Sequence, residues 1–226
     1  MNANTKEISE ILLHKSATKQ FIYRNTMEYF NEFKSQLKSI EKELKESVTP
    51  ANENVKIECK EEGQFEVRFQ FSGDVLVFNM HTNVFNFEEV HPVLKLGYVR
   101  ENPMRAYCGM IEIYNFLADS LKYNRIHDLG YLIGRLFINM EGNFFAEGKG
   151  QIGFLYQDFQ AQKLQSETIR NIIESSIKYA LDFDLWAPKM EEVLEISVLE
   201  KIQQQGMVAH KTGKRLGFTM SWQENQ

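Results

Sequence analysis

The pattern closest to enzyme chemistry in this sequence is the triplet Glu147-Gly148-Lys149. Side chains two positions apart on a β-strand point to the same face of its sheet, so a strand here would place a carboxylate beside an ammonium group. A carboxylate is a ligand for a hard cation such as Mg²⁺, and a bound cation can activate water for hydrolysis. Glu147 and Lys149 are therefore the candidate catalytic residues.

This triplet resembles the E-x-K element of metal-dependent nucleases of the PD-(D/E)xK type. The resemblance implies a Mg²⁺-dependent nuclease in which a hairpin strand presents Glu147 and Lys149. Such a site also needs a second acidic ligand within a few ångströms, because the cation has to be held from more than one side. An exposed ion pair on the sheet surface explains the same triplet without any metal, and this interpretation is favoured.

The second acidic ligand has three candidates. Asp128 is the first, but a hairpin that sets residue 138 opposite Glu147 leaves Asp128 about ten residues, or roughly 33 Å, away along the strand. If residues near 128 are helical instead, Asp128 no longer begins a strand as that element requires. Glu112 and Glu141 remain as substitutes.

Other metal or nucleophile patterns are weak. No pair of histidines has the i, i+2 or i, i+4 spacing of a metal site. The two cysteines, Cys59 and Cys108, lie on apolar-patterned segments, which predicts reduced core residues rather than a disulfide or an activated thiol. The basic cluster 210–215 is typical of a lysine-rich turn. We therefore predict no metal and no cofactor.

The segment 107–125 combines aromatic and hydrogen-bonding side chains, a mixture suited to recognition. Tyrosine and arginine are enriched at binding hot spots. The predicted binding residues are Tyr107, Tyr114, Tyr123 and Arg125. A core strand followed by a polar loop would give the same composition.

The composition is that of a globular protein. The chain has 226 residues, of which 43% are hydrophobic and 25% charged, so it can bury a sizeable core. We expect a single α+β unit over 1–226, or two closely packed halves, 1–100 with a helix and meander and 101–226 with a hairpin and helices. The 31 acidic and 26 basic residues are mixed along the chain, which argues against an extended nucleic-acid surface.

Cellular location is inferred from apolar runs. The longest one near the amino terminus has three residues, far too short for a signal-peptide core. No stretch approaches the 18 or so apolar residues of a membrane span. The expected location is the cytoplasm, with no membrane partner.

Hydrophobic periodicity predicts the elements of the first half. Apolar residues at alternating steps of three and four indicate a long helix over 19–47, ended by Thr49-Pro50. From 55 to 87 the period changes to two, which predicts a four-stranded antiparallel meander. Turns are expected at Glu62-Gly63, Ser72-Gly73 and Thr82-Asn83.

The second half is less regular. Both periods fit 109–136, with a strand favoured at 109–116 and a short helix capped by Asp128 after it. The further elements expected are a short strand at 93–99, a hairpin at 135–149 whose second strand continues over 152–156, a helix at 166–182 behind a Ser166 cap, a helix from Pro188 to Gly206, and a closing strand at 216–222.

Read in order, these elements resemble the type III secretion chaperone-like α+β fold. The match lies in the order of the long helix, meander, hairpin and later helix, and it omits the last 40 or so residues. The resemblance implies protein binding through the sheet and a dimer formed by helices.

The sequence therefore favours a non-catalytic binding or chaperone-like protein, with the Mg²⁺-dependent nuclease as the alternative. No enzyme is favoured, because no acid, base and nucleophile converge. The expected partner is a protein or a second copy of the chain. A homodimer would form through an exposed sheet edge or through the helical seam of Phe30, Phe33, Leu37, Ile40 and Leu44.

Overall fold

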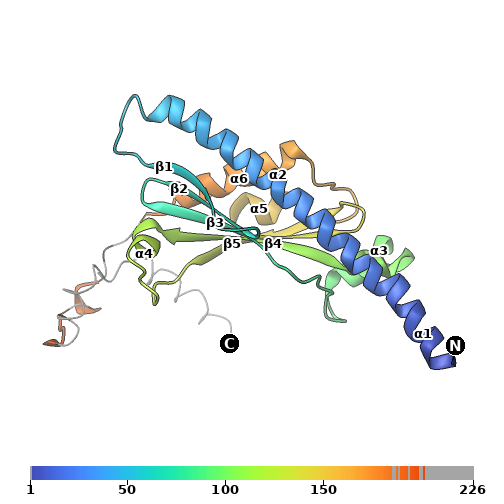
Figure 1. Cartoon of the computed structure of the whole chain (residues 1–226). Helices are drawn as coiled ribbons and strands as arrows, with labels where there is room; N and C mark the ends of the chain where they lie inside the picture. Colours follow the sequence, from blue (N-terminus) through green and yellow to red (C-terminus); the bar gives the residue numbers. More distant parts are fainter. Residues whose placement is uncertain (1, 185–186, 188, 193, 199–200, 202–226) are drawn as a thin grey trace.

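The computed structural model describes residues 2–184, 187, 189–192, 194–198 and 201. They form an α+β fold around one six-stranded sheet whose strands follow the chain order β1 to β6. Every neighbouring pair is antiparallel. The long helix α2 and the later helix α6 lie on the same side of this sheet (Figure 1). The predicted fold class is confirmed.

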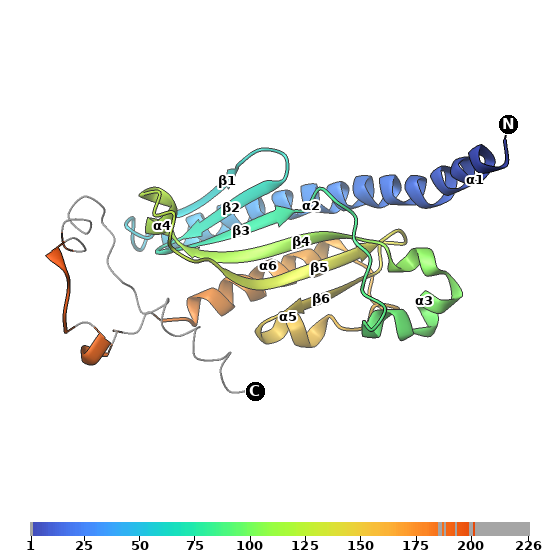
Figure 2. The ribbon, with the colours of Figure 1, turned by 90° about the horizontal axis from the view of Figure 1, so that it is seen from below.

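The amino-terminal helix is one long rod. It begins with α1 (Ala3–Ile11), passes through a π-helical turn η1 (Leu12–Ser16), and continues as α2 (Ala17–Val48). The predicted helix over 19–47 is confirmed, and it ends at Thr49 before Pro50. Figure 2 shows that α2 crosses the sheet while α1 projects past the ends of the strands.

The six strands are β1 (Ile57–Glu61), β2 (Glu66–Phe71), β3 (Asp74–Met80), β4 (Cys108–Leu117), β5 (Tyr131–Asn139) and β6 (Phe144–Gly148). The strand predicted over 109–116 and the hairpin predicted over 135–149 are both present. Strands β3 and β4 pair from Asp74↔Leu117 to Met80↔Ile111. The segments before and after residue 100 therefore share one sheet.

Two of the predicted turns have the backbone that they require. Gly63 has φ of 86° and Ser72 has φ of 56°, in the left-handed region where tight hairpin turns need a tolerant residue. The prediction of a fourth meander strand directly after Thr82-Asn83 is wrong. Phe85 forms only an isolated bridge with Cys108, because the chain then leaves the sheet.

The predicted strand at 93–99 is also wrong, because this segment forms three short helical turns. They are η2 (Pro92–Lys95), α3 (Gly97–Glu101) and η3 (Pro103–Ala106). The prolines stand in the first helical turn, where their missing N–H leaves no bond unmade. The side chains of His91 and Asn102 accept hydrogen bonds from the backbone two residues on, so each acts as an N-cap.

In the segment after β4, helix and strand do not lie where they were predicted. A short helix α4 (Ala118–Lys122) comes first, and the helix predicted after Asp128 is the strand β5 instead. Residues 150–155, expected to extend β6, form the helix α5 (Gly150–Leu155). Glycines explain the second change: Gly134 pairs with Gly148, and a Cβ built on either would lie 3.1 Å from Cγ2 of Ile152. The absence of side chains at these two glycines leaves room for the Ile152 side chain to pack against the sheet.

The helix α6 (Ser166–Leu181) is confirmed, although its N-cap is Gln165 rather than Ser166. The Ser166 hydroxyl instead bonds the side chains of Glu32 and Gln36 on α2. The continuous helix predicted from Pro188 to Gly206 is wrong over its described part, because residues 190–192 form only the short 3₁₀ turn η4 (Met190–Glu192) and residues 194–197 are not helical. The basic cluster 210–215 and the strand predicted at 216–222 lie outside the described residues.

The main core fills the space between the sheet and the helices α2, α5 and α6. Its fully buried members include Phe33 of α2, Phe69 of β2 and Phe78 of β3. The predicted seam belongs to this internal core: Phe30, Phe33, Leu37 and Ile40 are buried, and Leu44 packs against them. A smaller core lies around Tyr98, Phe137, Phe145 and Phe159, under the segment 85–106.

Candidate binding face

The side of the sheet opposite α2 and α6 carries the polar side chains of the strands, and we call it the open face. Directly paired residues of antiparallel strands share one face, so the register groups these side chains into rows. One row, the ionic row, consists of Glu66, Asn79, Glu112, Arg135 and Glu147. The next, the mixed row, consists of Lys60, Arg68, Val77, Tyr114 and Leu132.

Glu147 lies in the ionic row as the partner of Arg135. The Arg135 Nε donates to Glu147 Oε2 at 2.6 Å, and His91 Nε2 lies 3.7 Å from Glu147 Oε1. The residue opposite Glu147 is Arg135 and not residue 138, so that expected register is wrong by three positions. Glu147 therefore forms an ion pair on the sheet surface, but its partner is Arg135 and not Lys149 of the same triplet.

Lys149 does not share the face of Glu147. Strand β6 ends at Gly148, and Lys149 is the exposed N-cap of α5, with its backbone N–H donating to Ile133. The alternation that would align the two side chains therefore stops one residue too early. The E-x-K geometry expected of Glu147 and Lys149 is not formed.

The candidate second ligands are engaged elsewhere. Asp128 lies 3.0 Å from Arg125 Nε and accepts the Ser120 hydroxyl, while Glu141 binds Arg105 and Tyr98. Glu112 stands two strands from Glu147, about 9–10 Å at the usual strand spacing, with Arg135 between them. Among the described residues, no group of three or more His, Cys, Asp or Glu side chains could hold a metal ion.

A first hollow opens beside Glu147, with a cavity volume of about 280 Å³. We call it the aromatic hollow. His91 stacks on Phe87 at 4.5 Å, and Phe87 meets Phe137 edge to face at 5.2 Å between ring centroids. The hollow is lined by Phe85, Asn86, Phe87, Glu88, Val90, His91, Met110, Arg135, Phe137 and Glu147. A hollow lined in this way can hold one apolar or aromatic side chain of a partner.

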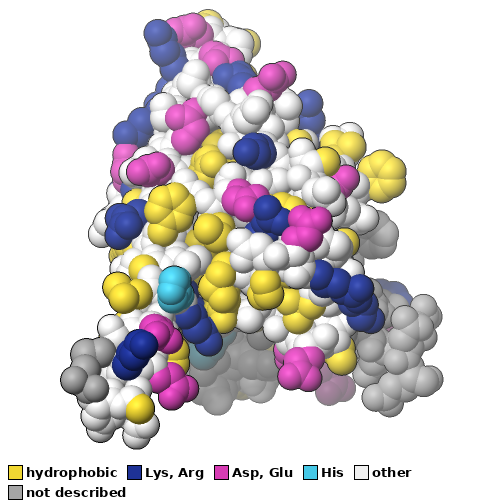
Figure 3. Space-filling model, turned by 90° about the vertical axis from the view of Figure 1, so that its right-hand side faces the viewer, with side chains coloured by type: hydrophobic (Ala, Val, Ile, Leu, Met, Phe, Trp, Pro, Cys, Tyr) yellow, Lys and Arg dark blue, Asp and Glu magenta, His cyan; other side chains and the backbone are white. Residues whose placement is uncertain are grey.

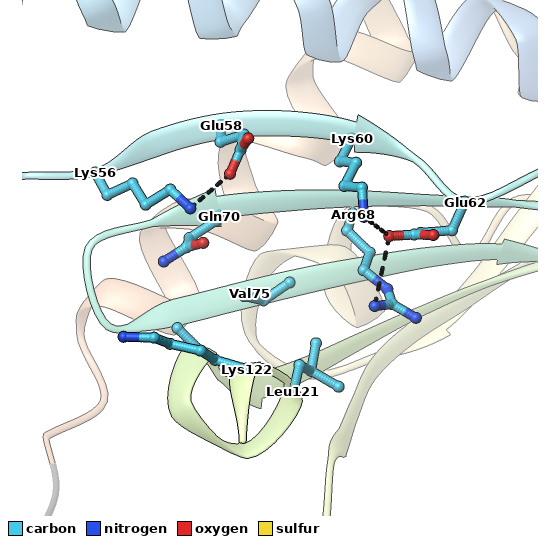
Figure 4. A pocket seen from close by; sticks show the side chains of 10 residues that line it. Lys56, Glu58, Lys60, Glu62, Arg68, Gln70, Val75, Leu121 and Lys122 are labelled. Atoms are coloured by element: carbon cyan, nitrogen blue, oxygen red, sulfur yellow. Dashed lines mark ion pairs between the residues drawn. The ribbon is translucent and has the colours of Figure 1, made fainter. Parts of the chain in front are cut away.

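A second hollow, the charged hollow, lies between β1, β2 and α4 (Figure 4) and has a volume of about 260 Å³. Its lysines and carboxylates are paired, Lys56 with Glu58 at 2.7 Å and Lys60 with Glu62 at 2.6 Å. Hydrogen bonds from these lysines hold the pKa of each carboxyl below its usual value. Arg68 lies 3.7 Å from the same Glu62, so this hollow stays charged at neutral pH.

Two of the four predicted binding residues lie toward one end of β4. Tyr114 is half-buried in the mixed row, and its hydroxyl donates to Glu112 at 3.3 Å. Burial and the Glu112 charge raise the pKa of Tyr114, so it remains a neutral hydrogen-bonding group. Tyr123 follows α4 and is 44% exposed, with Lys122 Nζ 4.8 Å from its ring centroid.

The other two predicted binding residues are placed differently. Tyr107 precedes β4 at its opposite end and is buried under Lys15 and Lys19, whose ammonium groups lie 5.7 and 5.2 Å from its ring centroid. The Arg125 side chain is only 7% exposed, and its guanidinium pairs with Asp128. The four residues therefore do not form one continuous surface.

Neither cysteine is an activated nucleophile. Burial raises the pKa of Cys59 to about 11, with the Glu41 charge adding to the effect. Burial also raises the pKa of Cys108, which is fully buried in the smaller core. Both thiols are free, as the sequence indicated.

Sequence reasoning did not identify Arg135 as the partner of Glu147, or Phe87 and His91 as residues of the hollow beside it. It also did not place Arg68 in one row with Tyr114, because only the register between strands shows which residues share a row. The contact of His91 with Glu147 depends on the path of residues 85–91 over the sheet.

The comparisons of the chain with protein-family models, curated proteins and solved structures found no match. The resemblance to the type III secretion chaperone-like fold therefore stays a prediction based on element order. Within the described residues, no helix has the length and apolar character needed to span a membrane.

Proposed function

We propose that this protein is a non-catalytic binding or chaperone-like protein that holds a polypeptide segment on the open face. One observation carries the proposal. The helices cover one side of the sheet with a predominantly apolar core, whereas the mixed row on the other side presents Tyr114, Leu132 and Arg68 partly exposed. Aromatic, arginine and aliphatic groups side by side are typical of protein interfaces.

The two hollows suggest how such a segment is held. The aromatic hollow has room for one apolar side chain, and the charged hollow offers ammonium and carboxylate groups some strands away on the same face. The cations of this face stand beside carboxylates, as Arg135 does beside Glu147. A nucleic-acid backbone needs an unmatched positive surface, so a polypeptide of mixed charge fits this face better.

The nuclease alternative receives no support from the site. Glu147 is neutralised by Arg135, Lys149 lies off the strand, and the described carboxylates do not gather around a cation position. A binding role uses the same side chains without requiring any of them to do chemistry.

The test is selection from a displayed library of random 16-residue peptides on the purified full-length protein. We expect enrichment of peptides that bind the wild type and that lose at least tenfold in affinity on Leu132→Glu, because this substitution places a charge in the middle of the mixed row. Lys42→Glu is the matched control: it adds negative charge on the outer side of α2, where the Lys42 side chain is 79% exposed. It should leave binding unchanged.

Two results would overturn the proposal. One is the absence of any peptide enriched over a blank surface. The other is a set of peptides whose affinity falls equally for Leu132→Glu and Lys42→Glu, since binding would then not involve the open face.

A further inference from the structure

Residues 3–16, which are α1 and η1, form most of an exposed helical arm, residues 3–19, that carries several apolar side chains. No residue of α1 or η1 is buried. Four of their apolar side chains are more than half exposed, Ile8 at 56%, Ile11 at 51%, Leu12 at 57% and Leu13 at 69%. An apolar cluster of this kind, rimmed by charges, marks an interaction site.

This cluster precedes the first core residue of α2 by about three to four helical turns. That residue is Ile22, and one to two turns earlier Lys15 and Lys19 still reach the ring of Tyr107 on the body. Beyond them α1 projects past the strands (Figure 2), so Ile8 and Ile11 have no sheet to pack on. Figure 3 views the side toward which α1 points and shows hydrophobic side chains exposed there among lysines and carboxylates.

The surfaces first expected to form a dimer are occupied within the chain. The helical seam is buried in its own core, with Phe30, Phe33 and Leu37 at 0% exposure. At the β1 edge, Glu41 of α2 accepts the N–H of Cys59 at 3.0 Å. The seam is therefore closed to a second copy, and one backbone donor of the β1 edge is already engaged.

The opposite sheet edge is covered in the same way. The N–H of Phe144 donates to Gln162 at 3.0 Å and the N–H of Ala146 donates to Tyr156 at 2.6 Å. The segment between α5 and α6 thus takes the place that an added strand would need. Edge-to-edge pairing through these groups of β6 is blocked.

The charges of the arm are segregated along its length. Its first half, with Lys6, Glu7 and Glu10, has a net charge of −1, whereas its second half, with Lys15 and Lys19, has a net charge of +2 and also carries His14. In a twofold antiparallel pair centred between residues 11 and 12, Glu7 of one copy lies opposite residue 16, next to Lys15 of the other. Glu10 lies opposite residue 13, next to His14. A parallel pair would set the carboxylates against each other.

We propose that the arm, residues 3–19, is a self-association site at which two copies pair antiparallel. The apolar contacts are then Ile11 against Leu12 at the centre and Ile8 against the aliphatic stem of Lys15 on either side. The interface is isologous, as in most dimers of soluble proteins. This association is independent of the open face and stands whether or not that face binds a peptide.

The arm is short, at about 26 Å for residues 3–19 at 1.5 Å per residue, so the dimer buries less than a standard interface. We therefore expect reversible association in the range of about 10–100 µM, a weak affinity typical of small interfaces. The dimer would be populated at high concentration and lost on dilution.

The decisive experiment uses charge exchange in the full-length chain. Variant A carries Glu7→Lys and Glu10→Lys, and variant B carries His14→Glu and Lys15→Glu. Each variant alone places like charges across the antiparallel pair and should stay monomeric in sedimentation equilibrium up to 200 µM. An equimolar mixture of A and B should dimerise at least as well as the wild type, because every clash becomes an attraction.

Ile8→Glu with Leu12→Glu should also give a monomer with an unchanged unfolding transition, since neither side chain is buried. A wild type that remains monomeric at 200 µM would overturn the proposal, as would a dimer that persists in the Ile8→Glu and Leu12→Glu variant. Wild-type protein that is monomeric but binds vesicles of anionic phosphatidylglycerol, and loses this binding in that variant, would assign the arm to a lipid surface instead.

Discussion

The two faces of the sheet are formed by the same strands but differ in burial and in side-chain chemistry. On β4, Ile111 and Ile113 point into the main core and are fully buried. Glu112 and Tyr114, which alternate with them, lie partly exposed on the open face. The inward set is apolar and closely packed, whereas the outward set is mixed: Met110, Phe137 and Phe145 belong to the smaller core, and the exposed polar residues form ion pairs that water can screen. Stability should therefore depend on the covered face, and recognition on the open one.

The largest effect should come from the covered face. Phe78→Ala removes a fully buried ring that contacts Phe33 of α2 at 5.9 Å between centroids. We expect the free energy of unfolding to fall by about 3–5 kcal/mol, as for other buried phenylalanines, because the cavity cannot collapse between helix and sheet. Urea denaturation followed by circular dichroism measures this. A loss below about 1 kcal/mol would contradict the packing described.

A smaller effect should come from the polar network that ties α3 to the β5–β6 turn. The Tyr98 hydroxyl donates to Glu141 at 2.7 Å and accepts from Asn139 at 2.9 Å. Tyr98→Phe keeps the ring but leaves these groups without their partner. We expect a loss of about 1.5–3 kcal/mol, the usual range for a hydrogen bond to a charged group, measured by urea denaturation.

The same network predicts a pH dependence. Partial burial raises the pKa of Glu141, but hydrogen bonds from Arg105 and Tyr98 outweigh it, and the pKa lies below 4.5. Because the folded-state pKa is depressed, this carboxylate stabilises the fold above its unfolded pKa, and the contribution is lost as pH falls through the folded value. Glu141→Gln should remove that part of the acid sensitivity below about pH 4.5, with wild type as the control.

The smallest stability effect should be that of Arg135→Ala on the open face. The Arg135 and Glu147 side chains are 42% and 37% exposed, so their ion pair is screened by water. The unfolding free energy should change by less than about 1 kcal/mol. Affinity for peptides selected on the open face should nevertheless fall several-fold by fluorescence anisotropy. A large stability loss with unchanged affinity would reverse the roles assigned to the two faces.

The regular elements were predictable because their periods are long and uninterrupted. The apolar steps of the long helix and the alternation in β2 and β4 are set by backbone geometry alone. Residues 92–106 were not predictable in this way, because proline and the capping side chains of His91 and Asn102 override an apolar run that reads as a strand. The first residues of β5, 131–134, were predicted as helix because the role of Gly134 depends on Ile152, eighteen positions later.

The candidate site was less predictable than the fold. Glu147 was recognised as a chemistry-bearing residue, but its role depends on Arg135 across the hairpin, and a register error of three positions concealed that pair. Tyr114 lies on an outward position of β4, which is the strand favoured at 109–116. Arg125 was expected at a contact surface, yet a polar residue in a loop can turn inward when a carboxylate such as Asp128 lies three positions on.

The order of the strands has a consequence for how the chain assembles. Each strand pairs with the strand that precedes or follows it in sequence. The strands are therefore connected without crossovers, by short loops and by the two longer segments β3–β4 and β4–β5. Local pairing of this kind gives low contact order and rapid folding. The long-range step is the docking of α6 on α2, where Arg170 meets Glu43 across 127 residues and Ser166 meets Glu32 across 134. During synthesis the sheet can thus form before α2 is fully buried. The apolar stripe of α2 is covered completely only after α6 has been synthesised and docks on it.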